Sequence, residues 1–301
     1  MGKPEHSEAD RSLSLGTLYA FSAYLLWGFM PFYWKWLDTV SAVELFAHRV
    51  VWAAVLAAIL VLLTQRHELR RALSDRRAVL VSSFAGILVG ANWLLYVWAV
   101  TNDHLVESSL GYYINPLVSV LLGIVILRER LTRLQLVALL LAAAGVLVLT
   151  ISHGSFPWIS VGLASSFAVY GLVKKTSRLN ALTSLMVEMT VVSPIAIGVI
   201  VWRAVAGSGS FVTAGLDTSL LLVGTGLVTV APLLLFGAGA RRIPLSRVGF
   251  LQYIAPTLML LIGTVIYHEP FTKVHAMSFA CIWTALAIYT ASLVRARRRN
   301  R

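Results

Sequence analysis

The chain has 301 residues, of which 58% are hydrophobic and only 13% charged, and its mean hydropathy is +0.80. A soluble domain of this length needs about 25% charged residues to cover its surface, so the composition excludes a water-soluble enzyme, a disordered chain and a secreted module. The single cysteine, Cys281, excludes a disulfide framework and a multi-cysteine metal site. The composition therefore predicts a polytopic membrane protein.

Ten apolar stretches are long enough to cross ~30 Å of hydrocarbon as helices. In chain order they are residues 14–37, 42–64, 78–101, 104–127, 133–150, 157–174, 180–202, 217–240, 245–267 and 274–294. The first run is too long for a signal-peptide core and no small-residue cleavage site follows it, so we expect an uncleaved first helix. The sequence predicts an all-α protein with ten transmembrane helices.

The net charge of +12 is distributed along the chain in a regular way. Of the 25 Lys and Arg residues, 21 lie in the two terminal tails and in every second connector. Cytoplasmic segments attract positive charge, which predicts that both termini are cytoplasmic. The excess of Lys and Arg over Asp and Glu then indicates the membrane topology and favours attraction to anionic membrane lipid. We expect no nucleic-acid partner.

An internal repeat relates the two halves of the chain. A shift of 140 residues places residues 113–116 (Tyr-Ile-Asn-Pro) on residues 253–256 (Tyr-Ile-Ala-Pro). Without a gap, residues 86–133 then match residues 226–273 at 14 of 48 positions, which include Pro, Gly, Glu and Thr. We expect a first five-helix repeat at 14–150 and a second at 157–294, between an N-terminal tail, 1–13, and a basic C-terminal tail, 295–301.

Five helices is an odd number, so the second repeat must be inverted relative to the first. Corresponding positions agree with this: Glu107 opens the fourth predicted helix, whereas its counterpart Arg247 opens the ninth on the basic side. Inverted repeats are typical of secondary transporters, whose substrate binds at the repeat interface near the bilayer midplane.

Two segments with one pattern follow the fourth and ninth predicted helices: residues 128–132 (Arg-Glu-Arg-Leu-Thr) and 268–272 (His-Glu-Pro-Phe-Thr). With the ten helices in two halves, they resemble the drug/metabolite transporter superfamily and its EamA domains, although the usual glycine before the glutamate is replaced in both copies. Further segments resemble the RarD permeases within that superfamily, namely residues 44–52, 92–95, 110–117 and 249–254. The resemblance covers about Leu15 to Leu293. It implies an inner-membrane permease of a group associated with chloramphenicol sensitivity.

Charged groups within predicted membrane helices are costly and mark candidate functional sites. Glu44 and His48 lie four residues apart on one face of the second helix, so they can contact each other. A His–Glu pair can carry a proton, or it can be a structural pair that neutralises Arg49; both interpretations stay open. Glu188 is the expected repeat counterpart of Glu44, which favours a shared structural or gating role.

Polar and aromatic side chains on the third, fourth and ninth predicted helices are candidates for a substrate cavity. Pro116 and Pro256 each remove a backbone donor and are expected to kink their helices at equivalent depths. Aromatic walls with few hydrogen-bonding groups suit an amphipathic organic solute, although ordinary helix packing explains the same residues. The candidate cavity residues are Asn92, Tyr96, Tyr112, Tyr113, Asn115, Gln252 and Tyr253.

Other chemistries lack their motifs. There is no phosphate-binding GxxxxGK[ST] loop, no HExxH and no His/Cys cluster, so we expect no metal, no cofactor and no catalytic residue. The sequence predicts a transporter of a small organic metabolite or amphipathic drug, and the resemblance to the RarD permeases implies chloramphenicol as an example. A membrane-embedded enzyme acting on lipid or peptide would need a clustered catalytic set, and a receptor would need a signalling domain. The sequence leaves both a monomer and a homodimer open.

Overall fold

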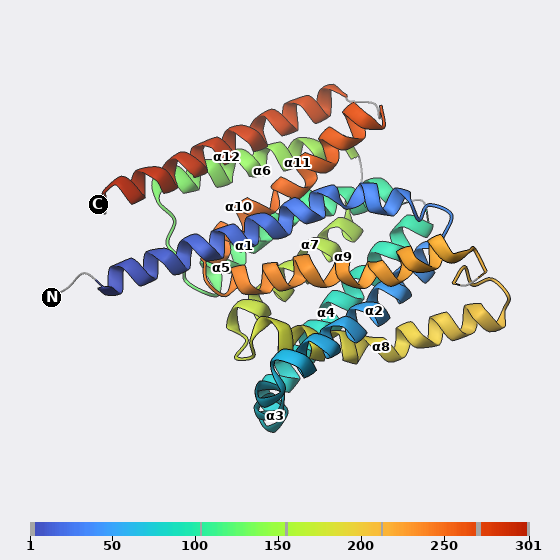
Figure 1. The fold of residues 1–301 in the computed structure, drawn as a ribbon. Helices are drawn as coiled ribbons and strands as arrows, with labels where there is room; N and C mark the ends of the chain where they lie inside the picture. The colour runs from blue at the N-terminus through green and yellow to red at the C-terminus, as the bar shows by residue number, and fades with distance from the viewer. Residues whose placement is uncertain (1–3, 103, 154–155, 212, 269–271, 300–301) are drawn as a thin grey trace.

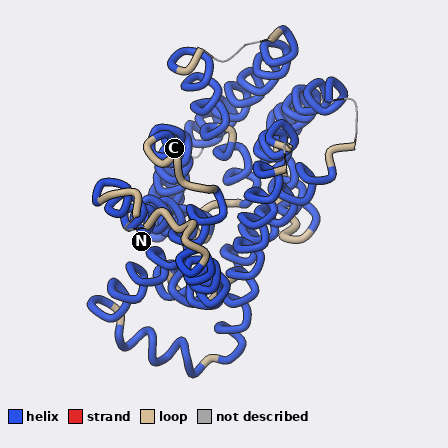
Figure 2. The backbone as a smooth tube through the Cα atoms, turned by 90° about the vertical axis from the view of Figure 1, so that its right-hand side faces the viewer, coloured by secondary structure: helices blue, strands red, loops and turns tan. Residues whose placement is uncertain are grey.

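A computed structural model describes residues 4–102, 104–153, 156–211, 213–268 and 272–299. In these ranges the chain forms helices joined by loops and contains no strand (Figure 2). Chain order gives α1 (Pro4–Lys35), α2 (Ala42–Thr64), α3 (Arg66–Ser74), α4 (Arg76–Thr101), α5 (Leu105–Val125), α6 (Arg133–His153), α7 (Trp158–Thr176), α8 (Ala181–Val205), α9 (Leu216–Ala240), α10 (Leu245–Gln252), α11 (Ile254–Leu261), the π-helix η1 (Ile262–Ile266) and α12 (Lys273–Arg299).

Eight of the described helical segments are long and apolar enough to cross a membrane. They are Arg11–Lys35, Ala42–Thr64, Arg76–Ala99, Arg133–Ser152, Ala181–Val205, Leu216–Ala240, Leu245–Ile266 and Lys273–Arg295. The other two predicted stretches correspond to α5, whose described apolar part is Ser109–Val125, and to α7, which ends in Lys174 and Lys175. The protein is therefore an all-helical, multi-pass membrane protein.

The helix boundaries follow local capping chemistry. Ser41 accepts a hydrogen bond from the backbone N–H of Glu44 at the start of α2, and Asp75 accepts one from Ala78 at the start of α4. Asn180 does the same for Thr183 at the start of α8, at 2.8 Å. Such side chains satisfy backbone donors that a helix leaves free in its first turn.

Two boundaries differ from the sequence expectation. The predicted N-terminal tail is helical from Pro4, and α12 continues through most of the predicted C-terminal tail. The basic connector after α2 contains a separate short helix, α3, which projects from one side of the bundle (Figure 1).

The long helices pack as one bundle, with both chain ends at the same end of it (Figure 1). In the bundle, α2 lies between α8 and α9, α4 lies between α7 and α8, and α1 packs against α9 and α11. α5 packs against α7 and α10, and α6 pairs with α12 beside them. The largest core cluster joins α1, α7, α9 and α10 around residues such as Tyr24, Tyr170 and Phe236.

Close packing of α4 on α8 depends on two glycines. A Cβ at Gly86 would lie 2.6 Å from the carbonyl oxygen of Glu188, and one at Gly90 would lie 3.0 Å from Val192. The Gly86–Gly90 pair thus brings the two helices into close contact, as a small-residue motif does in membrane bundles.

Candidate functional site

A cavity of about 540 Å³ lies between α1, α2, α4, α5, α7, α9, α10 and α11. Its volume is within the usual range for a small-molecule site. Helices from both halves of the sequence line it. Its aromatic lining comprises Tyr24, Trp27, Trp34, Trp93, Tyr96, Tyr112, Tyr113 and Phe167.

Six of the seven predicted cavity residues line this space. They are Asn92, Tyr96, Tyr112, Tyr113, Asn115 and Gln252. Tyr253 does not line it: its ring is 1% exposed and packs in a separate core cluster with Phe250 and Ile282. Adjacent residues of a helix point in different directions, so Gln252 faces the cavity while Tyr253 faces the core. Whether the six residues bind a substrate stays a prediction.

Hydrogen bonds hold several of the polar groups in place. Asn92 donates from Nδ2 to the carbonyl oxygen of Leu163 and to the hydroxyl of Ser166, both at 2.8 Å, which joins α4 to α7. Ser119 on α5 donates to Oε1 of Gln252 on α10 at 3.1 Å and lies 3.4 Å from Oδ1 of Asn115. These contacts connect α5 and α10 beside the cavity.

The two prolines act differently. Pro256 lines the cavity, and helical structure is interrupted three residues before it, between α10 and α11, because a proline cannot donate to the carbonyl one turn back. Pro116 lies within α5, which continues as one helix to Val125. A Cβ at Gly249 would lie 2.7 Å from the carbonyl oxygen of Pro116, so α10 packs tightly on α5 here.

The charged groups of the cavity are Arg49, Lys35 and Asp38. Lys35 and Asp38 pair with each other at 3.4 Å, and both are more than half exposed at one mouth of the cavity. The guanidinium of Arg49 lies 4.6 Å from the ring centre of Trp93 and 5.0 Å from that of Trp34. Its Nε donates to the hydroxyl of Thr229 at 3.3 Å.

The expectation that Glu44 neutralises Arg49 is wrong. Glu44 is buried and accepts hydrogen bonds from Nε of Arg203 at 3.2 Å, from the backbone N–H of Ser210 at 2.6 Å and from that of Phe211 at 3.2 Å. The carboxylate thus ties the first turn of α2 to the end of α8 and the loop after it. Sequence spacing could not reveal this partner, which is 159 residues away.

His48 is also buried and lies beside Glu44. Its Nε2 is 3.9 Å from Oε1 of Glu44, which agrees with the expected contact, and its Nδ1 accepts a hydrogen bond from the indole N–H of Trp52 at 3.2 Å. The imidazole packs against the ring of Phe211 at 4.9 Å between ring centres. Neither Glu44 nor His48 lines the cavity.

Glu188 forms a second buried cluster, between α7 and α8. Its carboxylate accepts from Nζ of Lys174 at 2.6 Å, from the hydroxyl of Ser184 at 2.5 Å and from the hydroxyl of Tyr170 at 3.0 Å. Removing one partner of such a buried pair leaves a charge in low dielectric. Lys174 was missed as a partner because it lies at the end of a predicted helix.

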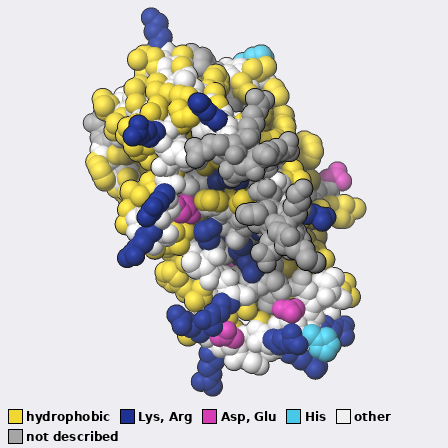
Figure 3. Space-filling model, turned by 90° about the vertical axis from the view of Figure 1, so that its left-hand side faces the viewer, with side chains coloured by type: hydrophobic (Ala, Val, Ile, Leu, Met, Phe, Trp, Pro, Cys, Tyr) yellow, Lys and Arg dark blue, Asp and Glu magenta, His cyan; other side chains and the backbone are white. Residues whose placement is uncertain are grey.

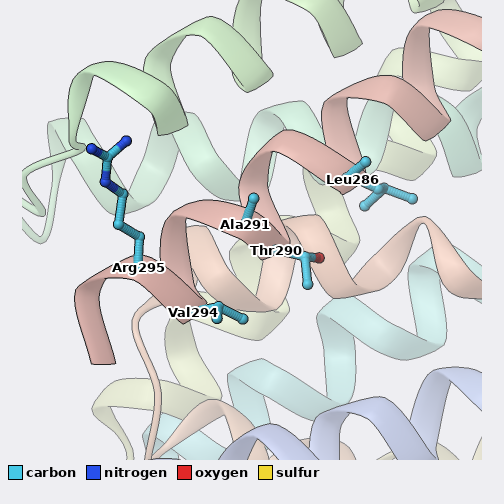
Figure 4. A pocket seen from close by; sticks show the side chains of 6 residues that line it. Leu286, Thr290, Ala291, Val294 and Arg295 are labelled. Atoms are coloured by element: carbon cyan, nitrogen blue, oxygen red, sulfur yellow. The ribbon is translucent and has the colours of Figure 1, made fainter. Parts of the chain in front are cut away.

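Another open pocket, of about 800 Å³, lies along the side of α12 (Figure 4). Apolar and small side chains line it together with Arg295. None of the residues that line this pocket also lines the central cavity. Groups of three or more His, Cys, Asp or Glu that could hold a metal ion are not found in the described part of the chain.

A multi-pass helical bundle around an aromatic cavity is an architecture typical of membrane transporters. The model of the EamA-like transporter family matches residues 14–151. The "Uncharacterized transporter YojE" of Bacillus subtilis is 43% identical over 99% of both chains, and the "Protein RarD" of Streptomyces exfoliatus is 42% identical over 98% of this chain and 94% of its own. The chain belongs to the EamA-like transporter family, which is a family of transporters and not of enzymes.

A further relative and one solved structure are also similar to the chain. The "Chloramphenicol-sensitive protein RarD" of Pseudomonas aeruginosa is 30% identical over 91% of this chain and 92% of its own. One solved crystal structure, 20% identical, superposes with a TM-score of 0.70 over 94% of this chain and 99% of that chain, which shows that the fold is shared.

Proposed function

We propose that the chain is a secondary transporter that moves a small organic metabolite or amphipathic drug across the cytoplasmic membrane by alternating access of two inverted repeats. The observation that carries this proposal is the central cavity, because helices from both halves line it, including α1, α4 and α5 of the first and α7, α9 and α11 of the second. A site shared between two halves can open to either side when the halves rock against each other.

The helix contacts support the two repeats, 14–150 and 157–294. Suppose that α1, α2, α4, α5 and α6 correspond, in this order, to α7, α8, α9, α10–α11 and α12. The contact of α1 with α9 then corresponds to the contact of α7 with α4. In the same way, the contact of α2 with α9 corresponds to the contact of α8 with α4. The pairs α2–α8, α5–α10 and α6–α12 map onto themselves. This is the pattern expected of a pseudo-twofold axis.

The motif after the fourth and ninth spans supports the same symmetry. Arg128 and His268 have φ angles of 54° and 55°, and they are the only described non-glycine residues with positive φ. This left-handed conformation favours glycine, which accounts for the glycine usual in the family. Two equal backbone conformations at matching positions support a common origin of the halves.

Glycine packing revises one correspondence within the repeat. A Cβ at Gly86 would meet the backbone of Glu188, and one at its counterpart Gly226 would meet the backbone of Trp52 at 2.7 Å. The packing therefore favours Trp52, not Glu44, as the counterpart of Glu188. A shared gating role for the two glutamates loses its support, and each is better explained by its own ion pair.

We propose that both termini are cytoplasmic. Lys and Arg side chains are spread over the face of the bundle at the end where the termini lie (Figure 3), as cytoplasmic segments require. Lys35, the last residue of α1, and Asp38 line the cavity at the opposite end of α1, so this mouth of the cavity then faces the outside.

Counterflow in proteoliposomes tests the function. Vesicles containing the full chain are loaded with one unlabelled solute and mixed with the labelled form, using amino acids, nucleotide precursors and chloramphenicol in turn. Transport predicts transient accumulation of one class of label above the level in protein-free vesicles. Equal uptake with and without protein for every solute class would contradict the proposal.

A further inference from the structure

The strongest unbalanced charge in the cavity belongs to Arg49. The other two charged residues in the described lining, Lys35 and Asp38, pair with each other, so the guanidinium carries the remaining charge of the described lining. Among the acidic side chains that the structure describes, none lies within ion-pair distance of Arg49, and Glu44, one helical turn away, is held by Arg203. A cation in an apolar, membrane-embedded site is costly unless something compensates it.

The surroundings of Arg49 hold the guanidinium in position without neutralising it. The rings of Trp34 and Trp93 attract a cation through their quadrupoles, which carry no net charge. The hydroxyl of Thr229, itself buried, accepts from Nε and fixes the side chain against α9. The hydrogen bond uses only one of the five N–H donors, and the described residues accept none from the two terminal nitrogens.

A planar guanidinium with free donors matches a carboxylate, which it binds with two parallel hydrogen bonds. The rest of the cavity wall is mainly aromatic. The rings of Trp27 and Phe167 meet edge to face with their centres 5.8 Å apart, and those of Tyr96 and Tyr112 do so with their centres 6.3 Å apart. Such walls suit a flat or apolar body. A ligand that fits both features has one anionic end and one aromatic or apolar end.

We propose that the cavity binds an amphipathic organic anion, whose carboxylate pairs with Arg49 and whose aromatic or apolar body lies against the tryptophan and tyrosine rings. This inference rests on the proposed transport function and adds the charge class of the substrate. Arg49 is then the residue that selects anions, and neutral or cationic solutes of similar shape bind less tightly because they leave the guanidinium unpaired.

Three indole probes of nearly equal shape test the charge class. Binding of indole-3-acetate, indole-3-acetamide and tryptamine to the purified full chain in detergent is measured by calorimetry. We expect the anion to bind at least about 10-fold more tightly than the neutral amide, which corresponds to about 1.4 kcal/mol, and the cation to bind most weakly. Equal or tighter binding of the amide or of tryptamine, or no binding of indole-3-acetate, would overturn the assignment.

Variants assign the preference to Arg49. Arg49→Gln should bind the acetate and the amide equally, Arg49→Lys should keep part of the preference, and Arg71→Gln, the same change on the exposed side of α3, should leave it intact. A preference that survives in folded Arg49→Gln would contradict the proposal. If that variant does not fold, the ranking of the three probes by the unmodified chain still decides it.

Counterflow with the same probes separates this inference from the transport function. Exchange of indole-3-acetamide without exchange or binding of indole-3-acetate would remove the anion assignment and leave the transporter. Tight, Arg49-dependent binding of indole-3-acetate by a chain that exchanges no solute would support the anion site and contradict transport.

Discussion

The carboxylate of Glu129 accepts a hydrogen bond from the backbone N–H of Leu245 at 2.6 Å and another from that of Ser246 at 2.9 Å. The glutamate follows α5, in the first half of the sequence, and the two N–H groups open α10, in the second. A carboxylate at this position satisfies free donors and interacts favourably with the helix dipole. The contact therefore fastens the two halves together at the end of the bundle away from Lys35 and Asp38.

Weakening this contact should open the cytoplasmic end. Glu129→Gln keeps the shape but loses the charge and one acceptor, at a cost of about 1–2 kcal/mol, so the ratio of the closed to the open state should fall by about 5–30-fold. Accessibility of a cysteine at Met259 in the cavity, measured with an impermeant maleimide from the cytoplasmic side, should rise. The same change at the exposed Glu68 serves as the control. Unchanged accessibility in Glu129→Gln would show that the contact does not hold this end closed.

The pair of Glu44 with Arg203 should be structural. Glu44→Gln leaves Arg203 without its carboxylate, at a cost of about 3 kcal/mol, so protein yield, gradient-driven uptake and exchange should fall together. His48→Gln loses a hydrogen bond from Trp52 worth about 1 kcal/mol and should be mild in all three measurements. The double variant Glu44→Gln, Arg203→Gln should recover part of the yield. Loss of gradient-driven uptake with intact exchange in His48→Gln would instead indicate proton coupling.

Truncation of cavity side chains should lower transport and spare insertion. Tyr112→Ala and Gln252→Ala each remove a lining group without adding charge, and we expect at least about 10-fold slower counterflow if each loses about 1.4 kcal/mol of contact. Asn92→Ala should do the same and also loosen α4 from α7. Tyr267→Ala, on an exposed tyrosine outside the cavity lining, is the matched control. Normal rates in all three variants would place the substrate elsewhere.

Reporter fusions test the membrane orientation. Reporters placed after Arg71, Lys175 or Arg242 should be cytoplasmic, because these positions lie in the basic connectors. Reporters after Asp103 or Ser155, which lie outside the described residues, should be external. An external reporter at Lys175 would mean that the first half has a missing or an additional span, and the inverted repeat would fail.

The sequence predicted the helices and most of the cavity lining because both depend on local patterns. Apolar runs define helices, and side chains such as Asn92 and Tyr96 share a helical face. It misplaced Tyr253, which packs in the core while its neighbour Gln252 faces the cavity. Trp34, which the sequence did not mark as a cavity residue, lines the cavity and contacts Arg49.

The long-range contacts of the glutamates could not be predicted from the sequence for a different reason. Glu44 with Arg203 and Glu129 with the start of α10 join residues 159 and 116 positions apart, and no periodicity records such contacts. The positive φ at Arg128 could have been predicted from one feature of the sequence, because the family motif that this segment resembles usually has glycine at this position. Tertiary packing decided which charged groups face one another.

Access to the cavity from both membrane faces tests the central claim most directly. In a Cys281→Ser chain, a cysteine at Met259, which lines the cavity, is treated with an impermeant maleimide in right-side-out and in inside-out vesicles. A cysteine at Ala142, fully buried between α6 and α12, controls for unfolding. Alternating access predicts that Met259→Cys reacts from both faces of the membrane. Added substrate should change the two reaction rates in opposite directions or protect the cysteine from both faces. The control, Ala142→Cys, should stay unreactive. Reaction of Met259→Cys from one face only, with and without substrate, would contradict the account.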